Sequence, residues 1–172
     1  MAPDPADGLY RLLERLGISY ERYDHEAVST CDEAERAVPA GLGAAHTKNL
    51  FLRDHKGRRH WLLVTLCAKQ VDLRAFGERV AGERVSFASP ERLAKYLGVT
   101  PGSVTILGLM NDGERAVELL VDEDVWAMDR WQAHPLTNTA TLILQRADIE
   151  RFLAETGHTA RAVSVPSRAG DG

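Results

Sequence analysis

The sequence has few cysteines, few aromatic residues and no long hydrophobic run. Cys31 and Cys67 are the two cysteines among 172 residues, and aromatic residues make up 6% of the chain. Two cysteines are too few for the disulfide framework of a small secreted domain, so we expect both to be small buried thiols. Because no stretch of about 18 apolar residues occurs, the sequence predicts no membrane-spanning helix.

The sequence also shows no signal-peptide pattern in its first residues and no excess of positive charge. Residues 1–7 contain neither the basic nor the apolar region of a signal peptide, so we expect a cytoplasmic protein. The net charge is −4 and the isoelectric point is about 5.9, which argues against a protein that coats nucleic acid. One dense basic stretch, residues 53–60, is expected to be a solvated hairpin tip, and a local contact with a nucleic-acid end is left open.

Familiar catalytic motifs are absent. The sequence contains no His-Glu-x-x-His, no Cys-x-x-Cys and no Gly-x-Ser-x-Gly, which mark zinc peptidases, metal or thiol sites, and serine hydrolases. Gly41 and Gly43 precede Lys48, but their spacing does not match the phosphate loop of nucleoside triphosphatases. We therefore expect a site that uses no metal, no cofactor and no cysteine.

Hydrophobic periodicity predicts helices and strands along the whole chain. Helices are predicted over 5–16, 30–37, 71–80, 90–97 and 148–156. Strands are predicted over 18–23, 47–53, 60–66, 104–107, 116–121, 139–144 and 160–165, with turns at 54–57 and 111–113. Because hairpins dominate the middle of the chain, the pattern favours an α+β fold with a mixed sheet over a doubly wound parallel one. We expect one domain, residues 1–166, and a disordered tail over 167–172.

Lys48 is notable because of its place in a predicted strand. Side chains alternate along a strand, so Lys48, Leu50 and Leu52 share one face. A cation at the rim of this core-facing surface needs a partner, because an unpaired buried charge is costly. An anionic ligand such as a phosphate is one such partner, and a surface lysine at a strand end is the alternative. For His134, the alternative to a site residue is a histidine satisfied within the core or a loop.

The segments around these two residues resemble one family. Residues 48–52, Lys-Asn-Leu-Phe-Leu, and 134–141, His-Pro-Leu-Thr-Asn-Thr-Ala-Thr, are similar to signature segments of the YbaK/aminoacyl-tRNA synthetase-associated domain family. More narrowly, they resemble its free-standing prolyl-tRNA editing subgroup, known as PrdX or ProXp-ala. Further similarity lies in residues 86–93, 97–105, 109–112 and 152–158. One segment departs from the family, because residues 25–30 read His-Glu-Ala-Val-Ser-Thr where His-Pro-Pro is usual.

The resemblance implies a trans-editing deacylase that hydrolyses the ester of mischarged alanyl-tRNA(Pro), without a cofactor, on a curved mixed sheet flanked by helices. Lys48 is the implied catalytic residue, because it holds the terminal phosphate or ribose and so places the ester. The implied substrate-binding residues are Thr30, Gly41, Gly43, Asn49, His134, Pro135 and Asn138. In the basic tip, the expected contacts to tRNA are Lys56, Arg58 and Arg59. The implied partner is the acceptor end of an aminoacyl-tRNA, while association with prolyl-tRNA synthetase and the oligomeric state are left open.

Two other functions are compatible with the sequence. The protein can be a deacylase for another mischarged tRNA, such as cysteinyl- or seryl-tRNA, because residues 25–30 resemble the part of the family that borders the amino-acid pocket. It can also be a non-catalytic module that binds tRNA or another nucleic acid, although the acidic net charge disfavours general DNA binding.

Overall fold

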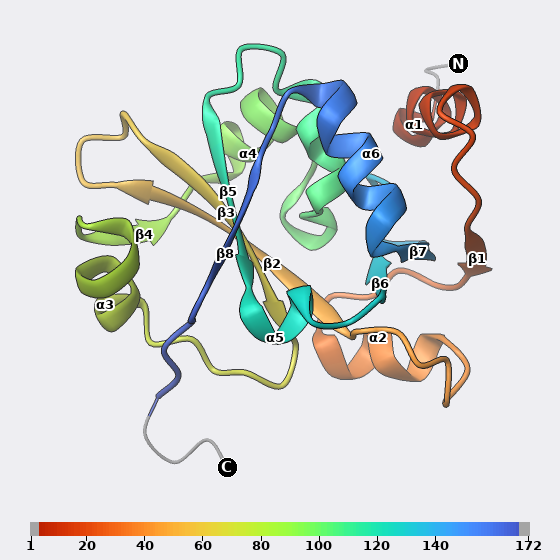
Figure 1. The fold of residues 1–172 in the computed structure, drawn as a ribbon, viewed down its shortest axis with the longest axis horizontal. Helices are drawn as coiled ribbons and strands as arrows, with labels where there is room; N and C mark the ends of the chain where they lie inside the picture. Colours follow the sequence, from red (N-terminus) through yellow and green to blue (C-terminus); the bar gives the residue numbers. More distant parts are fainter. Residues whose placement is uncertain (1–3, 169–172) are drawn as a thin grey trace.

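Two β-sheets organise the chain, and helices cover them (Figure 1). The structure is a computed structural model and describes residues 4–168. Its α-helices are α1 (Pro5–Arg15), α2 (Cys31–Ala37), α3 (Leu73–Phe76), α4 (Pro90–Leu97), α5 (Glu123–Trp126) and α6 (Arg146–Thr156). Its strands are β1 (Glu21–Asp24), β2 (Thr47–Asp54), β3 (His60–Leu66), β4 (Val85–Phe87), β5 (Val117–Asp122), β6 (Arg130–Ala133), β7 (Ala140–Gln145) and β8 (Ala160–Val163). No helix within residues 4–168 is long and apolar enough to cross a membrane.

The larger sheet has five strands in the order β4-β2-β3-β5-β8. Strand β2 pairs antiparallel with β3 and β4, whereas β5 pairs parallel with β3 and β8. The smaller sheet, β1-β7-β6, is antiparallel throughout. A parallel bridge between Ala45 and Trp131 joins the segment before β2 to β6, so the two sheets meet at the start of β2. The predicted α+β fold with a mixed sheet and flanking helices is therefore confirmed.

Alternation along the central strands places apolar side chains on both faces of the larger sheet. Phe51 and Leu62 belong to one hydrophobic cluster, which includes residues of α1, α4 and α6, while Leu52 and Leu63 belong to a second cluster with Phe76 of α3. Leu50 packs against this second cluster. The predicted common face of Lys48, Leu50 and Leu52 is thus the face toward α3, and the neighbouring residue Asn49 lies on the other face.

Several local predictions need correction. Residues 104–107 are not a strand, because Thr105 caps a 3-10 helix, η3 (Ile106–Asn111), by accepting a hydrogen bond from the Leu107 amide at 3.2 Å. The helix predicted over 71–80 is shorter, since α3 passes at Gly77 into a π-helix, η1 (Gly77–Ala81). A further 3-10 turn, η2 (Pro101–Ser103), precedes η3. The sequence reasoning missed three short elements, namely β4, α5 and β6.

The predicted disordered tail is wrong for its first two residues. Ser167 forms an antiparallel bridge with Val71, and the Arg168 amide donates to the Gln70 carbonyl at 2.9 Å. These backbone bonds tie the chain end to the loop after β3. Residues 169–172 lie outside the described part of the chain.

Candidate functional site at the junction of the two sheets

A small pocket lies where the two sheets meet. Its volume is about 20 Å³, which is small for a ligand site. Four elements and one loop contribute its walls: Ala34 of α2, His46, Thr47 and Asn49 at the start of β2, Gln132 and Ala133 of β6, His134 of the β6–β7 loop, and Thr141 of β7. The structure therefore brings together two segments, 46–49 and 132–141, that are far apart in the sequence.

His134 is a neutral histidine in this pocket. Its Nδ1 lies 3.0 Å from the Ala140 carbonyl oxygen, which only accepts, so Nδ1 carries the proton and Nε2 keeps its lone pair. Burial lowers the pKa of His134 below its ordinary value of 6.5. The nearby rings of His25 and His46 lower the pKa further, while the bond to Ala140 raises it. At neutral pH the ring can shape the pocket and accept a proton at Nε2, but it offers no positive charge.

Two further histidines surround this ring. His25 stands edge-on to His134 with ring centres 6.3 Å apart, and its Nε2 lies 2.9 Å from the Thr141 hydroxyl. His46 places Nε2 3.0 Å from the Cys31 carbonyl and Nδ1 3.3 Å from Oε1 of Gln132. Sequence reasoning missed His46, Gln132 and Thr141 as pocket residues. The quoted family segment already ended at Thr141, whereas no motif marked His46 or Gln132.

Asn49 contributes an unpaired acceptor to the pocket. Its Oδ1 is buried and has no hydrogen-bond partner within the described residues. An unsatisfied buried carbonyl oxygen costs roughly 1–3 kcal/mol, so such a group usually has a partner that arrives with a ligand or a water. Asn49 is therefore the member of the predicted substrate-binding set whose geometry most directly calls for a ligand.

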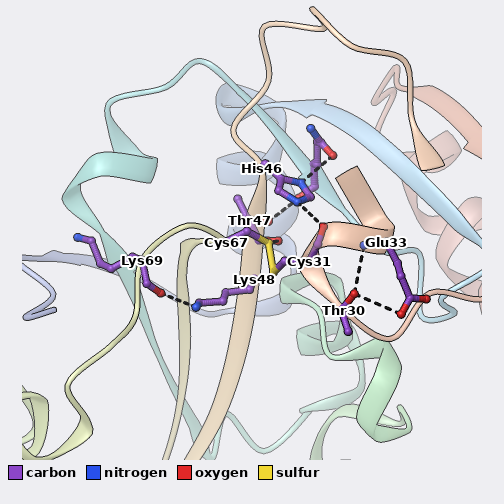
Figure 2. The surroundings of a disulfide bond; sticks show 9 residues. Thr30, Cys31, Glu33, His46, Thr47, Lys48, Cys67 and Lys69 are labelled. Carbon is purple, nitrogen blue, oxygen red and sulfur yellow. Dashed lines mark hydrogen bonds between the residues drawn. A yellow bond between two sulfur atoms is a disulfide. The ribbon is translucent and has the colours of Figure 1, made fainter. Parts of the chain in front are cut away.

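Lys48 does not line this pocket in the structure. Its side chain leaves β2 on the face opposite to Asn49 and donates from Nζ to the Lys69 carbonyl, in the loop after β3. Figure 2 shows Lys48 reaching toward Lys69 and away from His46. The Lys69 ammonium is itself held by Asp122 at 2.8 Å and Asp124 at 3.0 Å. The expected meeting of Lys48 and His134 in one pocket is thus not found in this arrangement.

Hydrogen bonds connect the β6–β7 loop to segment 25–30. Asn138 donates from Nδ2 to the Val28 carbonyl at 2.8 Å, and the Val28 amide donates to the Asn138 carbonyl at 3.2 Å. Pro135 and Leu136 are buried, and Leu136 has a φ of 67°, a left-handed conformation that is rare for a branched residue. Asn138 and Pro135 therefore shape the loop that carries His134, rather than line the pocket themselves.

The remaining predicted substrate residues lie outside the pocket. Gly41 and Gly43 are exposed turn residues with φ values of 78° and 66°, which explains why glycine stands at both positions. Thr30 is the N-cap of α2, where its hydroxyl accepts from the Glu33 amide at 3.1 Å. The Thr30 hydroxyl also donates to Oε1 of Glu33 at 3.2 Å.

The basic hairpin tip is remote from the pocket. Residues 55–59 connect β2 to β3 at the far end of β2, and eight strand residues span about 26 Å. Lys56 and Arg58 are exposed there, whereas Arg59 is paired with Glu83 at 2.6 Å and Glu118 at 3.0 Å. The expectation of a solvated tip is confirmed for residues 55–59, whereas Asp54 and His60 at the two ends of the stretch are buried. Arg59 is already paired with carboxylates.

The prediction of two separate buried thiols is wrong. Cys31 and Cys67 are joined by a disulfide, with Cα atoms 5.8 Å apart, and both are half-buried rather than buried. Their 36-residue separation hid the pairing, because only the tertiary fold brings Cys31, at the start of α2, next to Cys67, just after β3. The bond links α2 to the strand pair that carries Asn49 (Figure 2).

A larger hollow of about 640 Å³ lies elsewhere, along α3, η1 and β4. None of the predicted site residues lines it. Its walls alternate arginine and glutamate side chains around glycine, and no buried titratable group converges on it, so its size alone does not identify it as the reaction site.

Comparisons with known proteins identify related chains. Residues 25–152 match the family model described as the aminoacyl-tRNA editing domain. The prolyl-tRNA editing protein ProX of Acetoanaerobium sticklandii is 33% identical over 165 residues, covering 96% of this chain and 100% of that protein. The prolyl-tRNA synthetase associated domain-containing protein 1 of Danio rerio is 35% identical over 153 residues, covering 88% of this chain and 82% of that protein.

A solved structure has the same fold. It is described as a candidate trans-editing enzyme for prolyl tRNA synthetase, with a TM-score of 0.71 and 23% identity, covering 97% of this chain and 100% of that one. The matched region of the family model contains the β2 strand with Asn49 and the loop with His134. On the strength of the family match and the full-length similarity to ProX, the chain belongs to the aminoacyl-tRNA editing domain family.

Proposed function

We propose that the protein is a trans-editing aminoacyl-tRNA deacylase and that its substrate is alanyl-tRNA(Pro). Membership of the editing family and the names of the full-length relatives support the class of reaction, which is hydrolysis of the ester between a wrong amino acid and a tRNA. The choice of alanine is the finer part of the proposal and rests on the pocket.

The observation that carries the proposal is the size and lining of the pocket at the sheet junction. A pocket this small favours a methyl group over the bulkier pyrrolidine ring of proline. A synthetase pocket made for proline cannot strongly exclude a smaller residue, since each missing methylene is worth only about 1–3 kcal/mol. A second site that is too small for the correct amino acid removes the mistakes, and the small size of this pocket supports such a role.

The polar atoms of the pocket suit an aminoacyl ester. We assign Oδ1 of Asn49 to the α-ammonium group, because this oxygen is buried and lacks a partner within residues 4–168. Neutral His134 forms a wall and leaves its Nε2 lone pair available to a hydroxyl donor, such as the terminal ribose. A methyl group then points toward Ala34 and Ala133, which are small enough to receive it.

The reaction needs little from the protein beyond placement. A water oxygen bonds to the ester carbonyl carbon, the bond from that carbon to the ribose oxygen breaks, and the ribose oxygen takes up a proton. The neighbouring ribose hydroxyl assists the attacking water, so that no buried carboxylate is required as a base. Lys48 holds the terminal phosphate or ribose from the rim of β2, once its Nζ exchanges the Lys69 carbonyl for a substrate oxygen.

Deacylation assays test the proposal directly. Alanyl-, cysteinyl-, seryl- and prolyl-tRNA(Pro) are compared as substrates of the same preparation, and we expect alanyl-tRNA(Pro) to be hydrolysed fastest and prolyl-tRNA(Pro) to survive. Faster hydrolysis of the cysteinyl or seryl ester would identify cysteine or serine, and not alanine, as the amino acid that the enzyme removes. Tight tRNA binding without turnover on any of the four esters would favour the non-catalytic module instead.

The role of Lys48 needs its own pair of variants. We expect Lys48→Ala to abolish deacylation while the circular dichroism spectrum is unchanged. Lys95→Ala is the matched control, because Lys95 is an exposed lysine on α4 and its loss changes the net charge by the same amount. Hydrolysis by Lys48→Ala near the rate of the Lys95→Ala variant would remove Lys48 from the mechanism.

A further inference from the structure

A group of metal-binding side chains lies beside the pocket, and one of its members, His46, also lines the pocket. Cys31 starts α2, Cys67 follows β3, and His46 precedes β2, yet their ligand atoms all lie within 4.8 Å of one another. We propose that, after reduction of the disulfide, these three residues form a binding site for Zn²⁺. The inference stands apart from the proposed function, because it concerns metal binding and not ester hydrolysis.

Hydrogen bonds, in addition to the disulfide, hold the three residues near one another. The Cys67 amide donates to the His46 carbonyl at 2.9 Å, which continues the ladder between β2 and β3 beyond the strand ends. His46 in turn places Nε2 3.0 Å from the Cys31 carbonyl. These bonds keep the two thiols and the imidazole near one another once the bond between the sulfurs is cut. Figure 2 shows the three residues around the intact disulfide.

The donor set and its spacing suit zinc. Two thiolates and one imidazole are a common zinc donor set, with bonds of about 2.3 Å to sulfur and about 2.0 Å to nitrogen. A tetrahedral ion with such bonds separates its ligand atoms by roughly 3.5–3.8 Å, which lies within the 4.8 Å limit of the group. The sulfur atoms need only to move apart by a small side-chain rotation, and the fourth position is open to water.

The environment of His46 supports coordination. A zinc-bound histidine almost always donates its other ring N–H to a carbonyl or carboxylate oxygen, which fixes the orientation of the ring. His46 has an oxygen acceptor at each nitrogen, the Cys31 carbonyl at Nε2 and Oε1 of Gln132 at Nδ1. When one nitrogen binds the metal, the other therefore keeps an acceptor that orients the ring.

The chemistry of the change balances with a dithiol as the reductant. The dithiol passes two electrons and two protons to the sulfurs of Cys31 and Cys67 and becomes a disulfide itself. Zinc binding then releases both thiol protons, since the thiolate is the ligand. The metal ion then replaces the disulfide as the connection between α2 and the end of β3. Ala34 of α2 therefore stays in the wall of the pocket. Because α2 has no buried residue, it depends on such a link.

The test is metal binding by the full chain in its two redox states. Protein reduced with a dithiol and then freed of reductant under nitrogen is titrated with Zn²⁺ against a chromophoric chelator, and with Co²⁺ as a spectroscopic substitute. We expect one equivalent of Zn²⁺ with a dissociation constant below about 1 µM, and thiolate-to-Co²⁺ charge-transfer absorption. The oxidised protein should bind neither ion in this way. Equal binding by both redox states, or none by the reduced protein, would overturn the proposal.

Variants identify the ligands. We expect at least about 100-fold weaker Zn²⁺ binding from each of three variants, Cys31→Ser, Cys67→Ser and His46→Asn. Loss of a residue that binds the metal directly should weaken binding more than loss of a residue that only hydrogen-bonds to a ligand. His55→Asn is the matched control, because His55 is an exposed histidine at the remote hairpin tip and should leave binding unchanged. Binding by His46→Asn as tight as by His55→Asn would show that the imidazole is not a ligand. The comparison of redox states needs no variant, so it decides the proposal even if a variant fails to fold.

Discussion

At the scale of single residues, the face of a strand decides which side chain meets the pocket. The sequence drew attention to Lys48, but period-two alternation sends Lys48 toward Lys69 and sends Asn49 toward His134. The Oδ1 atom of Asn49 is buried and has no hydrogen-bond partner in the described part of the chain, whereas the Lys48 ammonium group already has one. The Asn49 oxygen is therefore the stronger indication of a bound ligand. The geometry therefore indicates Asn49, the neighbour of the predicted catalytic residue Lys48, as the residue that faces the pocket.

We expect Asn49→Ala to lower kcat/KM for alanyl-tRNA(Pro) by about 10- to 100-fold, because a hydrogen bond to a charged group is worth about 1.5–3 kcal/mol. Steady-state deacylation kinetics measure this change. Gln145→Ala is the control, since Gln145 carries an exposed amide and makes no cap bond to α6. Equal kcat/KM for the two variants would contradict the role of Asn49.

At the scale of elements, α2 is the most weakly packed part of the site. It is a seven-residue helix without a buried side chain, yet it supplies Ala34 to the pocket wall. Its position depends on the Thr30 cap at its start, the bond from Cys31 to Cys67 and the His46 contact to the Cys31 carbonyl. The short helix therefore responds to small changes at its N-terminus, while the strands that hold Asn49 do not.

We expect Thr30→Ala to loosen α2 locally. Loss of an N-cap costs about 0.5–2 kcal/mol, which corresponds to a roughly 2- to 30-fold faster amide exchange within residues 31–37. Hydrogen exchange followed by mass spectrometry measures it, and the global free energy of unfolding should stay the same. Ser89→Ala removes the equivalent cap of α4, whose Leu93 and Leu97 are buried, so that variant should lower global stability instead. A global loss of equal size in both variants would show that α2 unfolds only with the whole domain.

At the scale of the whole molecule, buried histidines connect stability to pH. His60 is buried between Phe51 and Tyr96, and its Nε2 accepts a hydrogen bond from Arg92 at 2.9 Å. Burial lowers the pKa of His60 below 6.5, and the nearby Arg92 charge lowers it further. His134 has a lowered pKa for the same first reason. The folded protein therefore holds both rings neutral at a pH where the unfolded chain would protonate them.

We expect the free energy of unfolding to fall as the pH drops below 6.5. Below pH 6.5 the unfolded chain binds protons on these histidines, whereas the folded protein does not. The stability that the neutral histidines contribute is therefore fully present above pH 6.5 and decreases as the pH falls from 6.5 toward the folded pKa values. The decrease is at most about 1.4 kcal/mol per pH unit for each histidine. Urea unfolding between pH 5 and 8 measures this slope. His60→Gln should reduce the slope although it also lowers stability at every pH. An unchanged slope in this variant would mean that His60 does not contribute.

How much could be predicted from the sequence depends on the range of the interactions involved. The β2–β3 hairpin and the helices α1, α4 and α6 follow from local patterns and were predicted close to their observed bounds. The short elements β4, α5 and β6 were missed, because three or four residues carry too little periodicity. The 3-10 helix at residues 106–111 replaced a predicted strand, since the Thr105 hydroxyl bonds its own backbone.

The sequence by itself determined the family, the α+β class and the two segments that build the site, because each depends on residue order within a short stretch. Only the tertiary structure decided that Asn49, and not Lys48, faces His134, that His46 and Thr141 complete the pocket, and that Cys31 meets Cys67. These outcomes depend on the twist and pairing of strands and on a helix packed across residues far apart in the chain. Such contacts have no local signature, since they come from the fold as a whole.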